Sequence, residues 1–137
     1  MISEKEIIEF QNEWGNGIVK MGKGELSVSL FSKHFYEKNA LFKPTMAKKV
    51  PFRLKNEEFE SYFVGGIFDE DSGFALKPWS DVRFENAKID VDENTAYAVG
   101  HYFFTDSNGE TTKVEYSFVY QKNLDGLIIK LHHSSLP

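Results

Sequence analysis

The N-terminal part of the chain has the hydrophobic spacing of amphipathic helices. Ser3 and Glu6 are spaced as a capping box, in which side chains satisfy the free amides at a helix start. Apolar residues then recur at intervals of three or four, which places them on one helical face. These residues are Ile7, Phe10, Trp14, Ile18 and Met21. Glycines at positions 22 and 24 predict the end of this first helix.

Two further helices are predicted before the pattern changes. The second covers about residues 25–38, with Leu26, Leu30 and His34 on its inner side and Phe31 and Phe35 as further candidates. Segments around the prolines at 44 and 51 are predicted to be extended or turns, because the residue before a proline avoids the helical region. The third helix begins at Asn56, carries aromatic residues at 59, 62 and 63, and ends at the glycines at 65 and 66.

From Trp79 onward the hydrophobic period is two, which is typical of strands. Val82 and Phe84 alternate in one phase and residues 87, 89 and 91 in the other, which predicts a bulge near Asn86. Further strands are expected at about 95–105, 111–121 and 127 to the end, separated by Asn-Gly and Asp-Gly turns. The chain is therefore predicted to be a single α+β domain, residues 1–137, with N-terminal helices packed on a curved antiparallel sheet.

The two tight turns also predict which side chains share a face of the sheet. Two-residue loops at 108–109 and 125–126 pair residue 101 with 116, 118 with 133 and 116 with 135. The core face then gathers polar groups at one end, namely His101, Tyr116, His133 and Ser135, beside Val99 and Phe118. Buried polar groups need partners, so a ligand pocket and a self-satisfied structural network are both open interpretations. A one-residue error in either turn would exchange the faces.

Composition excludes several classes of function. A net charge of −5 argues against binding to nucleic acid, which needs a clustered positive surface. No apolar run approaches the roughly 20 residues of a membrane span, and the first ten residues mix acids and bases, unlike a secretory signal. The absence of cysteine suits a reducing compartment, so we expect a cytoplasmic location. The adjacent His132 and His133 point to opposite faces of a strand, so neither a metal nor another cofactor is expected.

Several stretches of the chain resemble the iota-class carbonic anhydrases, the limiting-CO2-inducible proteins of algae and their bacterial relatives. The resemblance rests on FKPT at 42–45, YFVGG at 62–66, GFA at 73–75, PW at 78–79, FEN at 84–86, VEYSF at 114–118 and HHSSLP at 132–137. The ending also looks like the association domain of calcium/calmodulin-dependent kinase II. Both groups belong to the nuclear transport factor 2-like superfamily, and the resemblance therefore implies a cone-shaped α+β fold.

The resemblance further implies a site and an activity. Thr45, Tyr62 and Ser135 correspond to the hydroxyl residues that position water and bicarbonate in family members that work without a metal. The implied function is a metal-independent carbonic anhydrase, with His133 or His101 relaying the proton. In this hypothesis, Tyr116, Phe118 and Val99 line the pocket for a small ligand such as CO2. The alternatives are a non-catalytic binding or oligomerisation module and a lyase or isomerase that uses a pocket histidine as base.

The other face of the sheet is expected to form a homodimer interface. The register from the turns assigns Tyr102 and Phe104 to that face, beside Lys113, Glu115 and Lys130. An exposed aromatic patch of this kind usually marks an interface between subunits.

Overall fold

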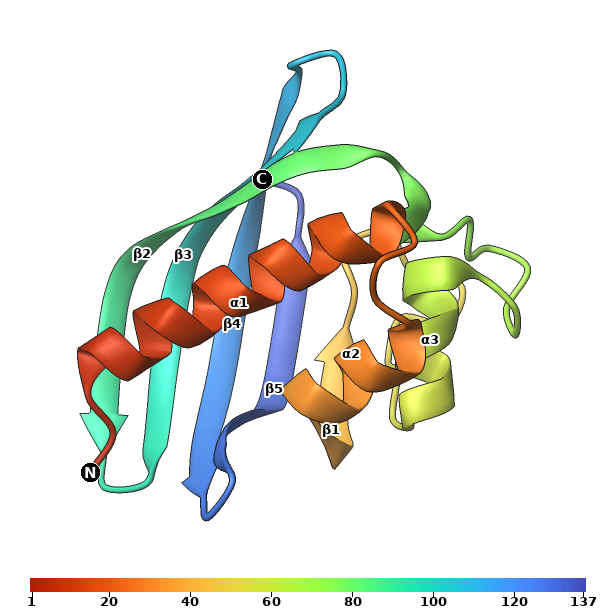
Figure 1. Ribbon diagram of the computed structural model, residues 1–137. Helices are drawn as coiled ribbons and strands as arrows, with labels where there is room; N and C mark the ends of the chain where they lie inside the picture. The colour runs from red at the N-terminus through yellow and green to blue at the C-terminus, as the bar shows by residue number, and fades with distance from the viewer.

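The computed structural model describes all residues, 1–137, as helices packed on a five-stranded sheet (Figure 1). The helices are α1 (Glu4–Gly22), α2 (Val28–Phe35) and α3 (Asn56–Val64), with a short 3-10 helix, η1, at Phe74–Leu76. The strands are β1 (Tyr36–Lys43), β2 (Trp79–Asp92), β3 (Thr95–Asp106), β4 (Thr111–Asn123) and β5 (Gly126–Ser135). The α+β class predicted from the sequence is confirmed.

The sheet is mixed rather than purely antiparallel. Its strand order is β1-β5-β4-β3-β2, and β1 pairs parallel to β5 while the other neighbours are antiparallel. Strand β1 was not predicted, since its first residues were assigned to the second helix. That helix ends at Phe35, and Tyr36 already has extended backbone angles. The residues after Tyr36 are Glu37, Lys38 and Asn39, which are uncommon in strands. The local pattern therefore did not reveal this strand, whose stability comes from pairing with β5.

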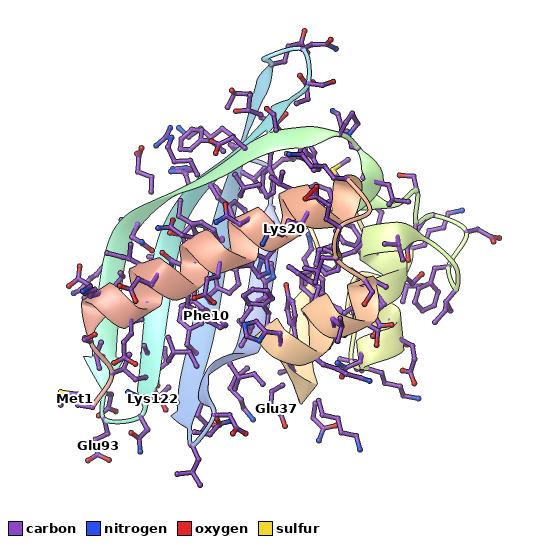
Figure 2. All side chains as sticks on the ribbon, viewed as in Figure 1. Met1, Phe10, Lys20, Glu37, Glu93 and Lys122 are labelled. Carbon is purple, nitrogen blue, oxygen red and sulfur yellow. The ribbon has the colours of Figure 1, made fainter.

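Helix α1 crosses the concave face of the sheet and supplies much of the core (Figure 1). The predicted capping box is present, with the Ser3 hydroxyl accepting from the Glu6 amide and the Glu6 carboxylate from the Ser3 amide. All five predicted apolar residues of its inner face are buried. Figure 2 shows Phe10 on the sheet side of the helix, and the Glu6–Lys122 ion pair (2.8 Å) ties the first turn to β4.

Helix α2 is shorter than predicted and turns a different face inward. Phe31 and Phe35 are buried, whereas Leu30 is 63% exposed and His34 is exposed. The ring of Phe31 lies against α1 at Gly17, where an added Cβ would be 2.7 Å from a ring carbon. Glycine is therefore required at this helix crossing. None of the helices combines the length and the hydropathy that a membrane span requires.

The loop between β3 and β4 has three residues, one more than predicted. Thr105 pairs with Thr111, and Asp106 N–H donates to the Glu110 carbonyl, which leaves residues 107–109 as the loop. The Asp106 carboxylate accepts from the amides of Asn108 and Glu110, and Gly109 takes the left-handed conformation (φ 83°) that such a loop needs. This extra residue shifts β3 by one relative to β4 and exchanges its faces.

The inner face of β3 is therefore the opposite of the predicted one. Tyr102 and Phe104 point into the core at 1% exposure each, together with Ala96 and Ala98. Val99, placed on the core face by the sequence, is 47% exposed on the outer face, and His101 lies there beside Glu115 (3.7 Å). The predicted core residues of β4, including Tyr116 and Phe118, are buried as expected.

Strand β5 contains a bulge that reverses its faces midway. Near the turn Tyr120 pairs with Ile129, but the next pair is Val119 with Leu131, so Lys130 has no partner on β4. Leu127 and Ile129 face the core as predicted, whereas beyond the bulge His132 and Ser134 face inward. The predicted bulge in β2 near Asn86 is also present, between Asn86 and Lys88.

Candidate active site

A small cavity with a few polar groups lies between the helices and the inner face of the sheet. It has a volume of about 10 Å³, roughly the space of one water molecule. Its lining is mostly aromatic and comes from α1, β1, α3, η1, β3 and β5. The lining residues are Trp14, Phe42, Thr45, Tyr62, Phe63, Phe74, Tyr102, Phe104, His132 and Ser134. A few converging polar groups in an apolar surround are typical of a small-molecule site.

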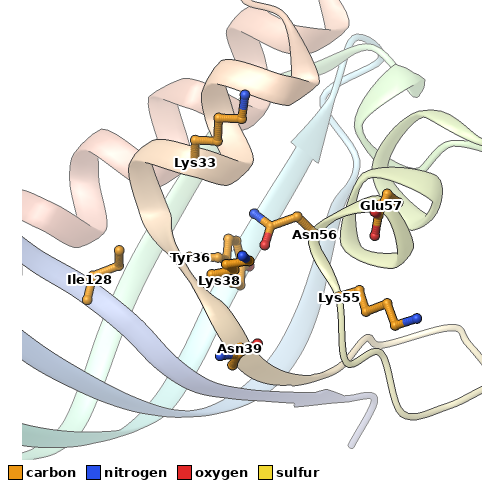
Figure 3. Close-up of a pocket in the computed structure, with 8 residues that line it drawn as sticks. All are labelled: Lys33, Tyr36, Lys38, Asn39, Lys55, Asn56, Glu57 and Ile128. Carbon is orange, nitrogen blue, oxygen red and sulfur yellow. The ribbon is translucent and has the colours of Figure 1, made fainter.

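Larger hollows lie on the surface of the molecule. One of them, of about 590 Å³, lies between α2, β1 and the start of α3 (Figure 3). Its lysines are surface residues, and in Figure 3 the amines of Lys33 and Lys55 point away from one another. We therefore treat the cavity around Ser134 as the candidate site.

Ser134 and His132, and not Ser135 and His133, reach this cavity from β5. Ser134 is 1% and His132 2% exposed, whereas Ser135 is partly exposed and His133 is exposed. The prediction that Ser135, His133, His101 and Val99 line the site is therefore wrong in its geometry. The error for the β3 residues comes from the three-residue loop before β4. The error for the β5 residues comes from the bulge at Lys130.

The two other predicted pocket residues of the sheet, Tyr116 and Phe118, are buried on the inner face but do not line the cavity. The Tyr116 hydroxyl donates to the Asn86 side chain (2.6 Å), which also exchanges hydrogen bonds with Gln11. This is a separate structural network beneath α1. The ring of Phe118 stacks on that of His132 with centroids 4.0 Å apart, and so supports the site from below.

Thr45 and Tyr62, which only the family resemblance selected, both lie at the cavity. The Thr45 hydroxyl is 2.5 Å from the Ser134 hydroxyl, and the Tyr62 hydroxyl accepts from the Met46 amide (3.3 Å). Burial raises the pKa of Tyr62 to about 12, so its hydroxyl keeps its proton near neutral pH. Each residue therefore brings a neutral hydroxyl group to the cavity.

A buried ion-pair cluster holds the two segments that carry Thr45 and Tyr62. Arg53, which is fully buried, makes two hydrogen bonds of 2.8 Å to the Asp71 carboxylate. The Glu70 carboxylate accepts from the amides of residues 48, 49 and 50 at 2.7–3.0 Å. These amides lower the pKa of Glu70 to about 2, so it stays charged and fixes the loop that follows Thr45.

His132 is held from both sides by tyrosine hydroxyls. Its Nδ1 is 2.8 Å from the Tyr36 hydroxyl and its Nε2 is 2.9 Å from the Tyr102 hydroxyl. Tyr102 in turn donates to Ser134 (2.5 Å), and the Trp14 indole donates to Tyr36 (3.3 Å). Burial lowers the pKa of His132 well below its ordinary value, so the ring is neutral and both of its nitrogens are occupied.

The signals for the residues that sequence reasoning missed were weak. Tyr102, His132 and Ser134 sit in alternating patterns whose phase depends on one loop residue and one bulge. Asp106 before Asn108-Gly109 was the available sign of a longer loop, since its carboxylate can cap the turn amides. No residue type marks the bulge at Lys130. No group of three His, Asp or Glu side chains lies close enough to hold a metal ion.

Comparison with known proteins identifies the family of the chain. The family model described as metal-independent carbonic anhydrase matches residues 5–136. The metal-independent carbonic anhydrase of Nostoc sp. (strain PCC 7120) is 35% identical over 152 residues, which span 99% of this chain and 74% of that protein. The chain belongs to the metal-independent carbonic anhydrase family.

Solved structures support both the family and the fold. The cyanobacterial iota-carbonic anhydrase, solved in complex with bicarbonate, superposes with a TM-score of 0.90 at 33% identity, covering 99% of this chain and 93% of that one. A protein described as a calcium/calmodulin-dependent protein kinase II association domain, from Xanthomonas campestris, has a TM-score of 0.75 at 22% identity, covering 100% and 89%. A nuclear transport factor 2-like protein of Shewanella oneidensis shares the fold at 16% identity (TM-score 0.64, covering 96% and 97%).

The neutral state of His132 predicts a pH dependence of stability. In the unfolded chain a histidine binds a proton below about pH 6.5, whereas the buried ring does not. As the pH falls below that value, the contribution of His132 should lower the free energy of unfolding by about 1.4 kcal/mol per pH unit. Above that pH, His132 should make no pH-dependent contribution. Urea denaturation of the wild type and His132→Gln across this range measures the difference in slope. Equal slopes would contradict a neutral buried His132.

Proposed function

We propose that the cavity bounded by Thr45, Tyr62 and Ser134 is where this chain carries out the reversible hydration of CO2 to bicarbonate. The observation that carries the proposal is the convergence of neutral hydroxyl groups in an aromatic cavity, in a member of the metal-independent carbonic anhydrase family. The bicarbonate complex of the cyanobacterial relative is consistent with it. CO2 is apolar and suits the aromatic walls, while bicarbonate is an anion that suits hydroxyl donors.

In this reaction a water oxygen attacks the CO2 carbon. The new C–O bond forms as one C=O electron pair moves onto oxygen, and the water loses a proton. Thr45 and Tyr62 would donate hydrogen bonds to the oxygen that becomes negative, which stabilises the transition state more than the uncharged CO2. The proton leaves toward solvent, because His132 has both nitrogens engaged and a lowered pKa.

The expected proton relay through His133 or His101 has no support in the geometry. Both side chains lie on the outer face of the sheet, away from the cavity. The same placement removes the support for a lyase or isomerase that uses either histidine as a base.

The route into the cavity runs between Thr45 and Phe74. These two lining residues are partly exposed, whereas the other eight are buried. A volume of about 10 Å³ holds a water but not the four heavy atoms of bicarbonate, so binding requires a lining side chain to move. Phe74 is the candidate, because it is the one aromatic lining residue that is partly exposed.

We also propose a homodimer through the outer face of the sheet, with different residues from those predicted. Tyr102 and Phe104 are buried inside, so they form no interface. Instead, an apolar row crosses four strands where Tyr97 pairs with Val119, Val119 with Leu131 and Leu131 with Leu41. Tyr97 and Leu41 are 44% and 52% exposed, and a contiguous apolar row fits a second copy of the chain.

A cytoplasmic location remains part of the proposal and fits the cysteine-free composition.

Substitution of the two neighbouring serines tests the site. Ser134→Ala removes the hydroxyl that contacts Thr45 and Tyr102, so CO2 hydration by stopped flow should fall by about 100-fold. Ser135→Ala is the matched control on the outer face and should keep the wild-type rate, with both proteins folded by circular dichroism. A larger loss in Ser135→Ala than in Ser134→Ala would contradict the assignment.

A pair of exposed leucines tests the dimer. Leu41→Glu places a charge in the apolar row and should convert a dimer to a monomer by light scattering at micromolar concentration. Leu30→Glu, at an even more exposed leucine on α2, should leave the mass unchanged. A monomeric wild type, or a Leu41→Glu protein that remains dimeric, would refute the interface.

A further inference from the structure

The hydrogen bonds of the site form one continuous chain from the core to the cavity. It runs from the Trp14 indole to Tyr36, then to His132, Tyr102, Ser134 and finally Thr45. The successive donor–acceptor distances are 3.3, 2.8, 2.9, 2.5 and 2.5 Å. The core end is closed, since Tyr36 is 1% exposed, and Thr45 at the other end is partly exposed. Each hydroxyl has one proton to donate, so the hydrogen-bond direction at the closed end constrains the directions that follow.

The closed end determines which way they point. The Trp14 indole can only donate, so the Tyr36 oxygen accepts there, and the only other polar neighbour of Tyr36 is His132 Nδ1. If Nδ1 carried the ring proton, the Tyr36 hydroxyl proton would have no acceptor. A buried unpaired donor disfavours that arrangement by about tenfold or more. Tyr36 therefore donates to Nδ1, and the ring proton lies on Nε2.

The remaining directions follow from this tautomer. His132 Nε2–H donates to the Tyr102 oxygen, and Tyr102 must then donate to Ser134. The Ser134 oxygen already accepts from Tyr102, and Thr45 is its other hydroxyl neighbour, so we assign the Ser134 proton to the Thr45 oxygen. The Thr45 hydroxyl also lies within hydrogen-bond reach of the Tyr62 hydroxyl, so the Thr45 proton is left for that hydroxyl or for a ligand in the cavity.

We propose that Tyr36, supported by Trp14, is a positioning residue that fixes the His132 tautomer and through it makes Thr45 a hydrogen-bond donor to the cavity. This deepens the proposed function of the cavity and rests on it. A reversed chain would present the Thr45 oxygen as an acceptor, which would repel the negative oxygen of the forming bicarbonate. The donor direction also leaves no acceptor in the chain for the water proton, which therefore leaves by the open side near Thr45.

Nitrogen-15 NMR of histidine-labelled protein tests the tautomer without any activity measurement. The chain has four histidines, and His132 is identified by the signals missing from His132→Gln. In the wild type its Nε2 should have the shift of a protonated nitrogen and its Nδ1 that of an unprotonated one. Tyr36→Phe removes the donor to Nδ1, so the two tautomers should become comparably populated. A wild-type ring protonated on Nδ1 would overturn the proposal.

Kinetics with a matched variant test whether the tautomer matters for catalysis. Tyr36 does not line the cavity, so Tyr36→Phe should lower kcat for CO2 hydration by about tenfold with KM little changed. Tyr120→Phe is the control. Tyr120 is equally buried, but its hydroxyl accepts from Gln11 and takes no part in the hydrogen-bond series from Trp14 to Thr45. This variant should keep the wild-type kcat and tautomer.

The outcomes separate this inference from the proposed function. A mixed tautomer in Tyr36→Phe with an unchanged kcat overturns the positioning role, as does a kcat loss equal to that of Tyr120→Phe. If Ser134→Ala still loses activity in that case, the cavity remains the site and only the role of Tyr36 fails.

Discussion

The arrangement of the site depends on a buried neutral imidazole clamped between two tyrosine hydroxyls. His132 is 2% exposed, and an unpaired ring nitrogen there would cost about 1–3 kcal/mol. Tyr36 from β1 and Tyr102 from β3 occupy both nitrogens, and Phe42 and Phe118 stack on the ring faces at 4.7 and 4.0 Å. One side chain therefore joins β1, β3, β4 and β5. Because Ser134 follows it on the same face, the clamp also sets where the serine hydroxyl lies.

The sequence predicted the elements better than their faces. The capping box, the inner face of α1, the β2 bulge and the core residues of β4 were all predicted, since each follows from local spacing. The faces of β3 and the end of β5 were wrong, because each depends on one inserted residue that the pattern does not reveal. Strand β1 was missed because it is defined by parallel pairing with a distant strand.

The candidate site was predicted in part for a related reason. Thr45 and Tyr62 came from the family resemblance alone, since a loop residue and a helix aromatic carry no local signal of a shared cavity. Ser134 was passed over for its neighbour, a one-residue choice that the bulge at Lys130 decided. The expectation of a polar cluster on the core face was correct in kind. The structure contains two such clusters, the structural network at Gln11 and the chain that ends at Thr45.

We propose that hydroxyl groups of the protein, without a metal ion, promote the hydration of CO2. The most direct test is oxygen-18 exchange between CO2 and water, followed by mass spectrometry, on protein treated with a strong chelator and shown metal-free by elemental analysis. We expect an exchange rate equal to that of untreated protein. Loss of exchange on metal removal, with recovery on adding back a stoichiometric transition metal, would contradict it.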